Sequence, residues 1–111
     1  MDRMKLGSAG EEMAASYLEA LGHKILERRY RNICGEIDII SYFDKAVYFV
    51  EVKTRSGLRY GRPAEAVNKN KIRHIRNVAS MYLERNPIMD REDLEYKIEV
   101  VEILVNELNV E

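Results

Sequence analysis

Apolar residues recur at intervals of three and four in two parts of the chain, and this pattern predicts two helices. The first covers residues 8–21, and Gly22 follows it as a C-terminal cap. Its apolar stripe consists of Ala14, Ala15, Leu18 and Leu21. The second covers residues 63–85, with a stripe of Ile72, Ile75, Ala79, Tyr82 and Leu83. Each stripe needs an apolar surface to pack against, so we expect the helices to flank a sheet.

Alternating apolar and polar positions predict four strands. Residues 24–33 form a charged strand, residues 36–42 and 47–54 form a hairpin around Asp44-Lys45, and residues 96–105 form the last strand. The order helix, three strands, helix, strand indicates an α/β fold with a central mixed sheet of about four strands flanked by helices. With 111 residues, the chain is expected to form one domain, 1–111.

The hairpin carries charged residues among its apolar ones, which is costly for groups that leave water. A two-residue turn at Asp44-Lys45 pairs residues whose numbers sum to 89, so Asp38 would face Glu51 and Glu36 would face Lys53. Alternation then places all four on one sheet face. Opposed carboxylates destabilise a strand pair unless a cation compensates them. Lys53 or a divalent metal would serve, and an ion-pair network that only holds the strand register is the structural alternative.

Two carboxylates at one sheet edge suit Mg²⁺ or Mn²⁺, which take oxygen ligands together with water and substrate phosphate. We therefore predict a metal site formed by Asp38, Glu51 and the Val52 carbonyl. Lys53 lies two residues after Glu51 and points the same way, so it can hold a nucleophilic water or offset charge on a phosphate. This chemistry is that of phosphodiester hydrolysis.

The segments "GEID" and "FVEVKTR" resemble the PD-(D/E)xK nuclease signature, with Asp38 as the aspartate and Glu51-Val52-Lys53 as E-x-K. The segments "GSAGEEMAASYLEALGHKIL", "YGRPAEAV", "KIRHIRNVASMYL" and "KIEVVEI" extend the likeness over nearly the whole chain. In this order they resemble the YraN-like uncharacterised protein family. That family is similar to restriction endonucleases and to archaeal Holliday-junction resolvases, which implies a restriction-endonuclease-like fold.

The resemblance also implies a metal-dependent endonuclease that acts on DNA, with branched or flapped DNA as the substrate class. Resolvases carry a glutamate in the first helix after a glycine, and Gly7 and Glu11 match that pattern. Catalytic residues would then be Glu11, Asp38, Glu51 and Lys53. Ser8 and Glu11 also fit a capping box, so a helix cap and an active-site carboxylate both remain open for Glu11. For Glu36 we expect a partner in Lys53 or Arg55.

Charge is distributed unevenly along the chain. The net charge of −1 divides into −2 for residues 1–52 (seven Lys and Arg, nine Asp and Glu), +7 for residues 53–76 (eight and one) and −6 for residues 77–111 (three and nine). Phosphate contacts depend on local Lys and Arg density, so the middle segment is the expected nucleic-acid surface. Its candidate contacts are Arg55, Arg62, Lys69, Lys71 and Arg73.

Nucleic acid, DNA first, is therefore the expected partner, with a homodimer as a second candidate. A binding module of the same fold that holds nucleic acid or a protein without cutting is the alternative function, and the acidic total favours it slightly. No apolar run reaches the ~18 residues of a membrane span, and the N-terminus lacks an apolar signal core. We expect a cytoplasmic protein without membrane contact.

Overall fold

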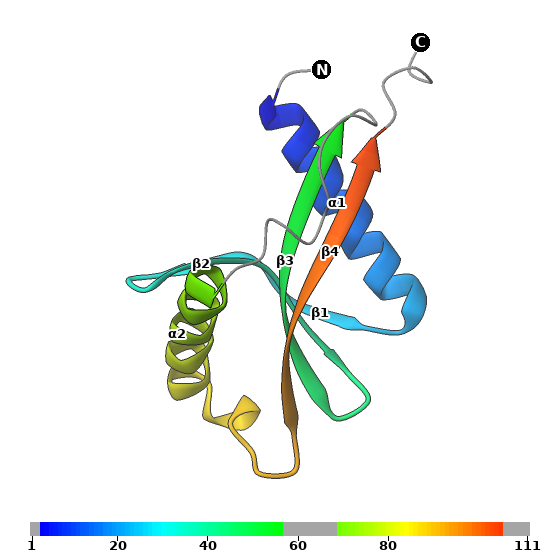
Figure 1. Ribbon diagram of the computed structural model, residues 1–111. Helices are drawn as coiled ribbons and strands as arrows, with labels where there is room; N and C mark the ends of the chain where they lie inside the picture. The colour runs from blue at the N-terminus through cyan, green and yellow to red at the C-terminus, as the bar shows by residue number, and fades with distance from the viewer. Residues whose placement is uncertain (1–2, 57–68, 106–111) are drawn as a thin grey trace.

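A four-stranded mixed sheet lies between two helices in the computed structural model, which describes residues 3–56 and 69–105 (Figure 1). The elements are α1 Arg3–Leu21, β1 Lys24–Asn32, β2 Gly35–Phe43, β3 Ala46–Ser56, α2 Lys69–Arg85, η2 Pro87–Met89 and β4 Glu95–Val105. The sheet order is β1-β2-β3-β4, antiparallel except for the parallel pair β3 and β4. This arrangement confirms the predicted α/β order and is consistent with a restriction-endonuclease-like fold.

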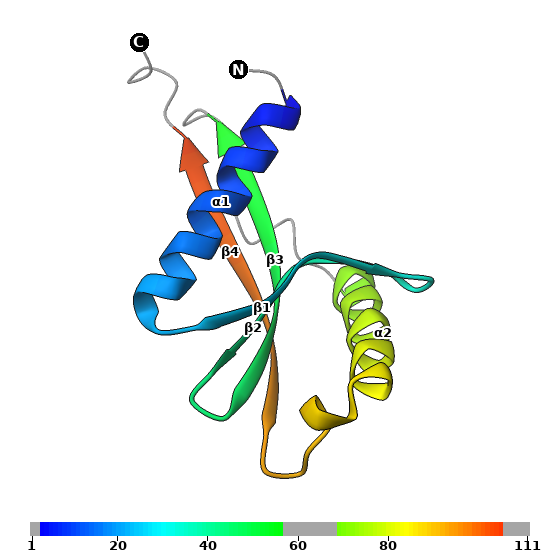
Figure 2. The same cartoon turned by 180° about the vertical axis from the view of Figure 1, so that it is seen from behind.

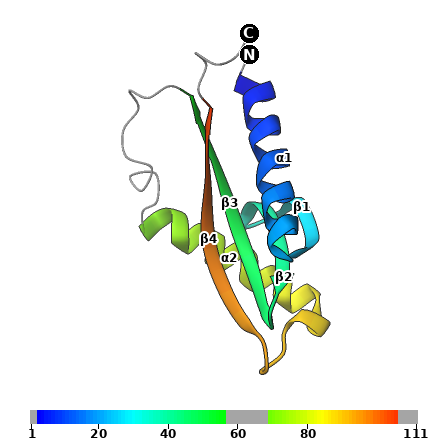
Figure 3. The same cartoon turned by 90° about the vertical axis from the view of Figure 1, so that its right-hand side faces the viewer.

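The helices cover opposite faces of the sheet, as the rear and side views make clear (Figures 2 and 3). Helix α1 packs its small residues and Leu18 against Ile39 and Val50, and all of these side chains are buried. Helix α2 packs Ile75, Val78, Ala79 and Tyr82 against Ile40, Val47 and Phe49. Consecutive residues such as Phe49 and Val50 therefore serve two separate apolar layers, because strand side chains alternate between faces.

The hairpin turn is the predicted one. Residues Asp44 and Lys45 have φ values of 49° and 62°, the left-handed conformation that two-residue hairpin turns require at both central positions. From this turn, the cross-strand pairs run from Phe43↔Ala46 to Ile39↔Val50, and the two residue numbers of each pair sum to 89 as predicted. The predicted register is therefore confirmed over five pairs.

Beyond Ile39 the predicted pairing is wrong, because β2 leaves β3 at this point. Neither Asp38 with Glu51 nor Glu36 with Lys53 belongs to the β2–β3 ladder. The first residues of β2 instead remain paired with β1 and extend over α2 (Figure 1). Ile37 consequently packs in the α2 layer, whereas Ile39 packs in the α1 layer, although strict alternation along a strand would place both on one face. A divergence of the two strands opens the sheet at Asp38.

The start of helix α1 differs from the prediction. Helix α1 begins at Arg3, so Ser8 lies in its second turn and is not an N-cap. The capping-box prediction for Ser8 and Glu11 is therefore wrong. Helix α2 begins at Lys69 in the described residues, and the part predicted for residues 63–68 lies outside them. Gly10 allows α1 to approach β3 closely, since a methyl group there would overlap the Thr54 hydroxyl.

Candidate active site

A cavity of about 230 Å³ lies where β2 separates from β3 and where the first half of α2 crosses the opening. Three carboxylates and one ammonium border it, together with one imidazole and one thiol. The lining residues are Cys34, Gly35, Glu36, Asp38, Glu51, Lys71, His74, Ile75 and Val78. The fold thus brings Asp38 and Glu51 to one cavity without pairing their backbones.

Asp38 takes the place of a missing ladder bond. The Val52 N–H donates a hydrogen bond of 2.7 Å to Asp38 Oδ2, so the side chain holds the β3 backbone at the position where β2 has turned away. Burial is the main cause that raises the pKa of Asp38 to about 6, and the charges of Glu51, Glu11 and Glu36 add to the rise. The hydrogen bond from Val52 acts in the opposite direction and lowers this pKa. The cavity therefore concentrates negative charge around one partly buried carboxyl group.

The Val52 carbonyl faces the same side. In an extended strand, the N–H and C=O of one residue point in the same direction, and the Val52 N–H points at Asp38. This geometry directs the Val52 carbonyl toward the opening between β2 and β3, as a metal ligand in that position requires.

The donor set suits a hard divalent cation. Among the residues with a described position, no group of three His, Cys, Asp or Glu side chains is arranged to hold an ion. A cation here would have two side-chain ligands, Asp38 and Glu51, and the Val52 carbonyl as a backbone ligand. Water or phosphate oxygens would complete its coordination shell. Because Asp38 Oδ2 accepts from Val52, Oδ1 is the oxygen left for such a ligand.

Glu51 is paired with a residue of α2. The Lys71 ammonium lies 3.3 Å from Glu51 Oε1, and the exposed fractions of the two side chains are 35% and 14%. Lys71 was predicted as a nucleic-acid contact, and the structure places it inside the carboxylate cavity. Lys53 shares the α2 face with Glu51, because Phe49 faces α2 and alternate residues follow it.

Glu11 interacts with β1 across the α1 side of the sheet. Arg29 Nε donates to Glu11 Oε2 at 2.7 Å, and Arg29 Nη2 donates to Ser8 Oγ at 3.3 Å. Arg29 lies between the β1 partners of Ile39 and Ile37, level with Asp38. Its φ of 52° is unfavourable for a non-glycine residue and costs on the order of 1–3 kcal/mol. A strained strand residue therefore supplies the counter-charge to Glu11.

Glu36 does not pair with Lys53 or Arg55 as predicted. Its partner is Arg31, at 2.8 Å, because the departing end of β2 stays beside β1. His74 and Cys34 also reach the cavity, although no sequence motif singled them out. His74 follows Lys71 by three residues and so lies on the same helix face. This spacing predicts that His74 reaches the cavity if Lys71 does.

The predicted nucleic-acid contacts do not form one uniform group. Lys69 and Arg73 are exposed at the start of α2, where a polyanion could reach them. Arg55 is half-buried, and its Nε has no hydrogen-bond partner within the described structure. Lys71 belongs to the cavity, and Arg62 lies outside the described residues.

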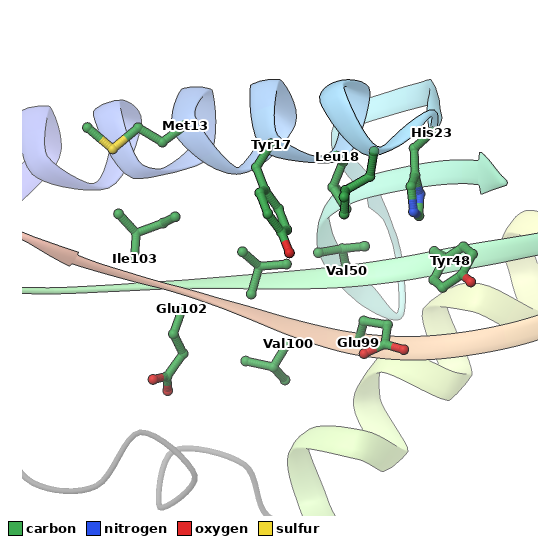
Figure 4. Close-up of a pocket in the computed structure, with 12 residues that line it drawn as sticks. Met13, Tyr17, Leu18, His23, Tyr48, Val50, Glu99, Val100, Glu102 and Ile103 are labelled. Atoms are coloured by element: carbon green, nitrogen blue, oxygen red, sulfur yellow. The ribbon is translucent and has the colours of Figure 1, made fainter.

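A separate groove of about 640 Å³ runs between α1 and β4 on the opposite face (Figure 4). Tyr17 and His23 project into it from the α1 side, and Glu99 lies across from them on β4. It shares no lining residue with the carboxylate cavity.

No helix in the described ranges has the length and hydropathy to cross a membrane.

Comparison with known proteins identifies the family. The profile of "Uncharacterised protein family UPF0102" matches residues 10–103, a range that runs from within α1 into the last part of β4. The chain belongs to this family. The protein from Caldicellulosiruptor saccharolyticus named "UPF0102 protein" is 38% identical over 109 residues, covering 98% of this chain and 90% of its own.

Two further relatives carry the same name. The protein from Alkaliphilus oremlandii is 43% identical over 99 residues, covering 89% of this chain and 84% of its own. The one from Syntrophomonas wolfei is 44% identical over 103 residues, covering 93% and 87%. These names state no activity or substrate, so an assignment of function rests on the chemistry of the site.

Proposed function

We propose that the protein is a divalent-metal-dependent nuclease that hydrolyses phosphodiester bonds in DNA. The observation that carries the proposal is the cavity at the β2–β3 divergence, where Asp38 and Glu51 meet and burial raises the pKa of Asp38. A carboxyl group that is costly to ionise, close to other carboxylates, gains most from a bound cation. Perturbed carboxyl groups in a cavity are typical of functional sites.

Asp38, Glu51 and the Val52 carbonyl would hold Mg²⁺ or Mn²⁺. When bound, the ion supplies Lewis-acid activation of a phosphoryl oxygen and of water. Lys53, on the same face of β3 as Glu51, orients the attacking water and offsets negative charge that develops on the phosphate. Glu11 sits on the α1 side with Arg29 and assists by adding negative charge near Asp38. Branched or flapped DNA is the substrate class that the family resemblance favours.

A non-catalytic binding module is the second candidate, and one observation favours it. Lys71 and Arg29 already neutralise Glu51 and Glu11, so of the three carboxylates proposed as catalytic, Glu11, Asp38 and Glu51, two have protein partners without a metal. Such a network would maintain the divergent strand geometry and leave Lys69 and Arg73 to hold a polyanion.

A cleavage assay separates the two candidates. Purified protein is incubated with labelled linear, flapped and four-way DNA in Mg²⁺, Mn²⁺ or EDTA. The nuclease proposal requires metal-dependent products that Asp38→Asn, Glu51→Gln and Lys53→Met each abolish. Binding of these DNAs with no product on any of them, in either metal, would contradict hydrolysis and support the binding module.

A further inference from the structure

The two edge strands of the sheet differ in how open they are to another strand. β1 is interrupted by a bulge between Ile25 and Glu27, and Arg29 has a positive φ of 52°. Bulges and charged residues protect an edge strand from further pairing. β4 instead pairs with β3 without interruption from Glu95 to Val105, and its sequence contains no proline. Its other side meets no strand within residues 3–56 and 69–105, so its outward N–H and C=O groups can pair with another chain.

An apolar groove of about 590 Å³ borders β4 on the α2 side of the sheet. Three residues of the strand line it, Tyr96, Ile98 and Val100, together with residues of α2. The ring of Tyr96 is 39% exposed, although its hydroxyl is bonded to the Met89 carbonyl at 2.8 Å and to the Arg91 N–H at 2.9 Å. An aromatic ring that is already ordered loses little side-chain entropy when a partner covers it, and such rings are typical anchors of protein interfaces.

The charge pattern of β4 matches that of a second copy of the same strand. A copy related by a two-fold axis perpendicular to the sheet runs antiparallel and keeps each side chain on its own face, so the numbers of opposed residues have an even sum. Lys97 and Glu99 both belong to the α1 side, where Lys97 lies over the Tyr48 ring at 5.5 Å and Glu99 lines the groove beside α1. With a sum of 196, Lys97 faces Glu99 twice, once on each side of a central pair of Ile98 residues.

Other registers of the same pairing lack this match. Sums of 198 and 204 place Glu99 against Glu99 and Glu102 against Glu102, and like charges directly opposite destabilise a strand pair. Sums of 200 and 202 place Lys97 and Glu99 against apolar residues. Among the registers that overlap at least the seven residues 95–101 or their equivalent, 196 is therefore the one that opposes unlike charges.

We infer that β4 is the interface of a symmetric dimer, in which two copies of the chain pair antiparallel about Ile98 and join their four-stranded sheets into one. On the α2 side, Tyr96 of each copy faces Val100 of the other and covers the groove. On the α1 side, Lys97 and Glu99 form two cross-strand ion pairs. The described lining of the carboxylate cavity contains no residue of β4, so the interface leaves the cavity of each copy open. The inference is independent of the proposed function.

A charge exchange across the interface tests the inference. Sedimentation velocity of the full-length protein in EDTA, at about 0.1 to 100 µM, should show a monomer–dimer equilibrium. Lys97→Glu and Glu99→Lys should each raise the dimer Kd by about tenfold or more, because both ion pairs become like-charge pairs. The double variant Lys97→Glu, Glu99→Lys restores unlike charges and should regain the wild-type Kd. Such a rescue is not expected if the single substitutions only disturb the fold.

The matched control makes the same charge change on the other edge of the sheet. Lys24→Glu, at the exposed start of β1, should keep the wild-type Kd. A wild type that stays monomeric at the highest concentration would overturn the inference. A dimer that Lys97→Glu and Glu99→Lys leave unchanged, or that Lys24→Glu weakens equally, would place the interface elsewhere and would also overturn it.

Disulfide trapping tests the register. In a Cys34→Ser background, which removes the single cysteine, Ile98→Cys places two thiols opposite each other. The expected Cα separation of about 4.5–5.5 Å lies within the range of a disulfide. Mild oxidation should therefore give a covalent dimer on non-reducing electrophoresis. Glu95→Cys is the control, because the two copies of this position would lie about 20 Å apart. Equal cross-linking of both variants, or a folded Ile98→Cys protein that does not cross-link, would contradict pairing about Ile98.

Discussion

Replacing Asp38 with asparagine should stabilise the metal-free protein at neutral and alkaline pH. The pKa of Asp38 rises from 3.8 to about 6 in the folded state, chiefly through burial, so ionising this carboxyl group opposes folding. Stability from this group is fully present below the unfolded pKa and is lost as the pH rises through about 6. Asparagine cannot ionise, and its side-chain oxygen can still accept the Val52 N–H.

The size of the effect follows from the shift. About two pKa units correspond to at most ~3 kcal/mol at 1.36 kcal/mol per unit, and partial exposure of Asp38 reduces this through solvent screening. We therefore expect Asp38→Asn to raise the free energy of unfolding by about 1–2 kcal/mol at pH 8. The difference between the two proteins should vanish toward pH 4, where Asp38 is protonated when folded.

Urea unfolding in EDTA, followed by circular dichroism between pH 4 and pH 8, measures this difference. Asp44→Asn, at the exposed hairpin tip, is the matched control and should stay within about 0.5 kcal/mol of wild type. If Asp38 instead anchored an ion pair with Lys53, its replacement would leave a partly buried ammonium and cost up to ~3–5 kcal/mol. A destabilised Asp38→Asn protein at pH 8 would therefore refute the reasoning.

Three further predictions concern metal, polyanion and packing. Mg²⁺ at about 100 times its Kd should stabilise the wild type by about 2.7 kcal/mol and leave the melting temperature of Asp38→Asn almost unchanged; an equal shift in both would remove Asp38 from the metal site. Lys69→Ala and Arg73→Ala should each reduce the magnitude of the log-log salt slope of duplex binding by about 0.9, and unchanged slopes would place the nucleic acid elsewhere. Gly10→Ala should lower the free energy of unfolding by about 1–2 kcal/mol, because the added methyl group would overlap Thr54. The double variant Gly10→Ala, Thr54→Ala should recover part of this loss. A single variant as stable as wild type would show that α1 can shift away from β3.

The sequence by itself determined the order of the helices and strands and the hairpin around Asp44-Lys45. These features depend on local periodicity and on turn geometry, which neighbouring residues encode. It also singled out Asp38 and Glu51, because charged residues in an apolar hairpin are costly unless they serve a purpose. The predicted start of α1 is wrong because it also depends on a local pattern. Ser8 and Glu11 have the spacing of a capping box, but the helix begins at Arg3.

Only the tertiary structure decided how the charged residues meet. The divergence of β2 from β3 at Asp38 depends on the first residues of β2 staying with β1 and extending over α2. No local pattern encodes the pairing of Glu51 with Lys71 or of Glu11 with Arg29, since the paired residues lie 20 and 18 positions apart in the sequence. Which cation reaches which carboxylate is set by how two helices pack on opposite faces of one sheet, and that packing is a property of the whole core.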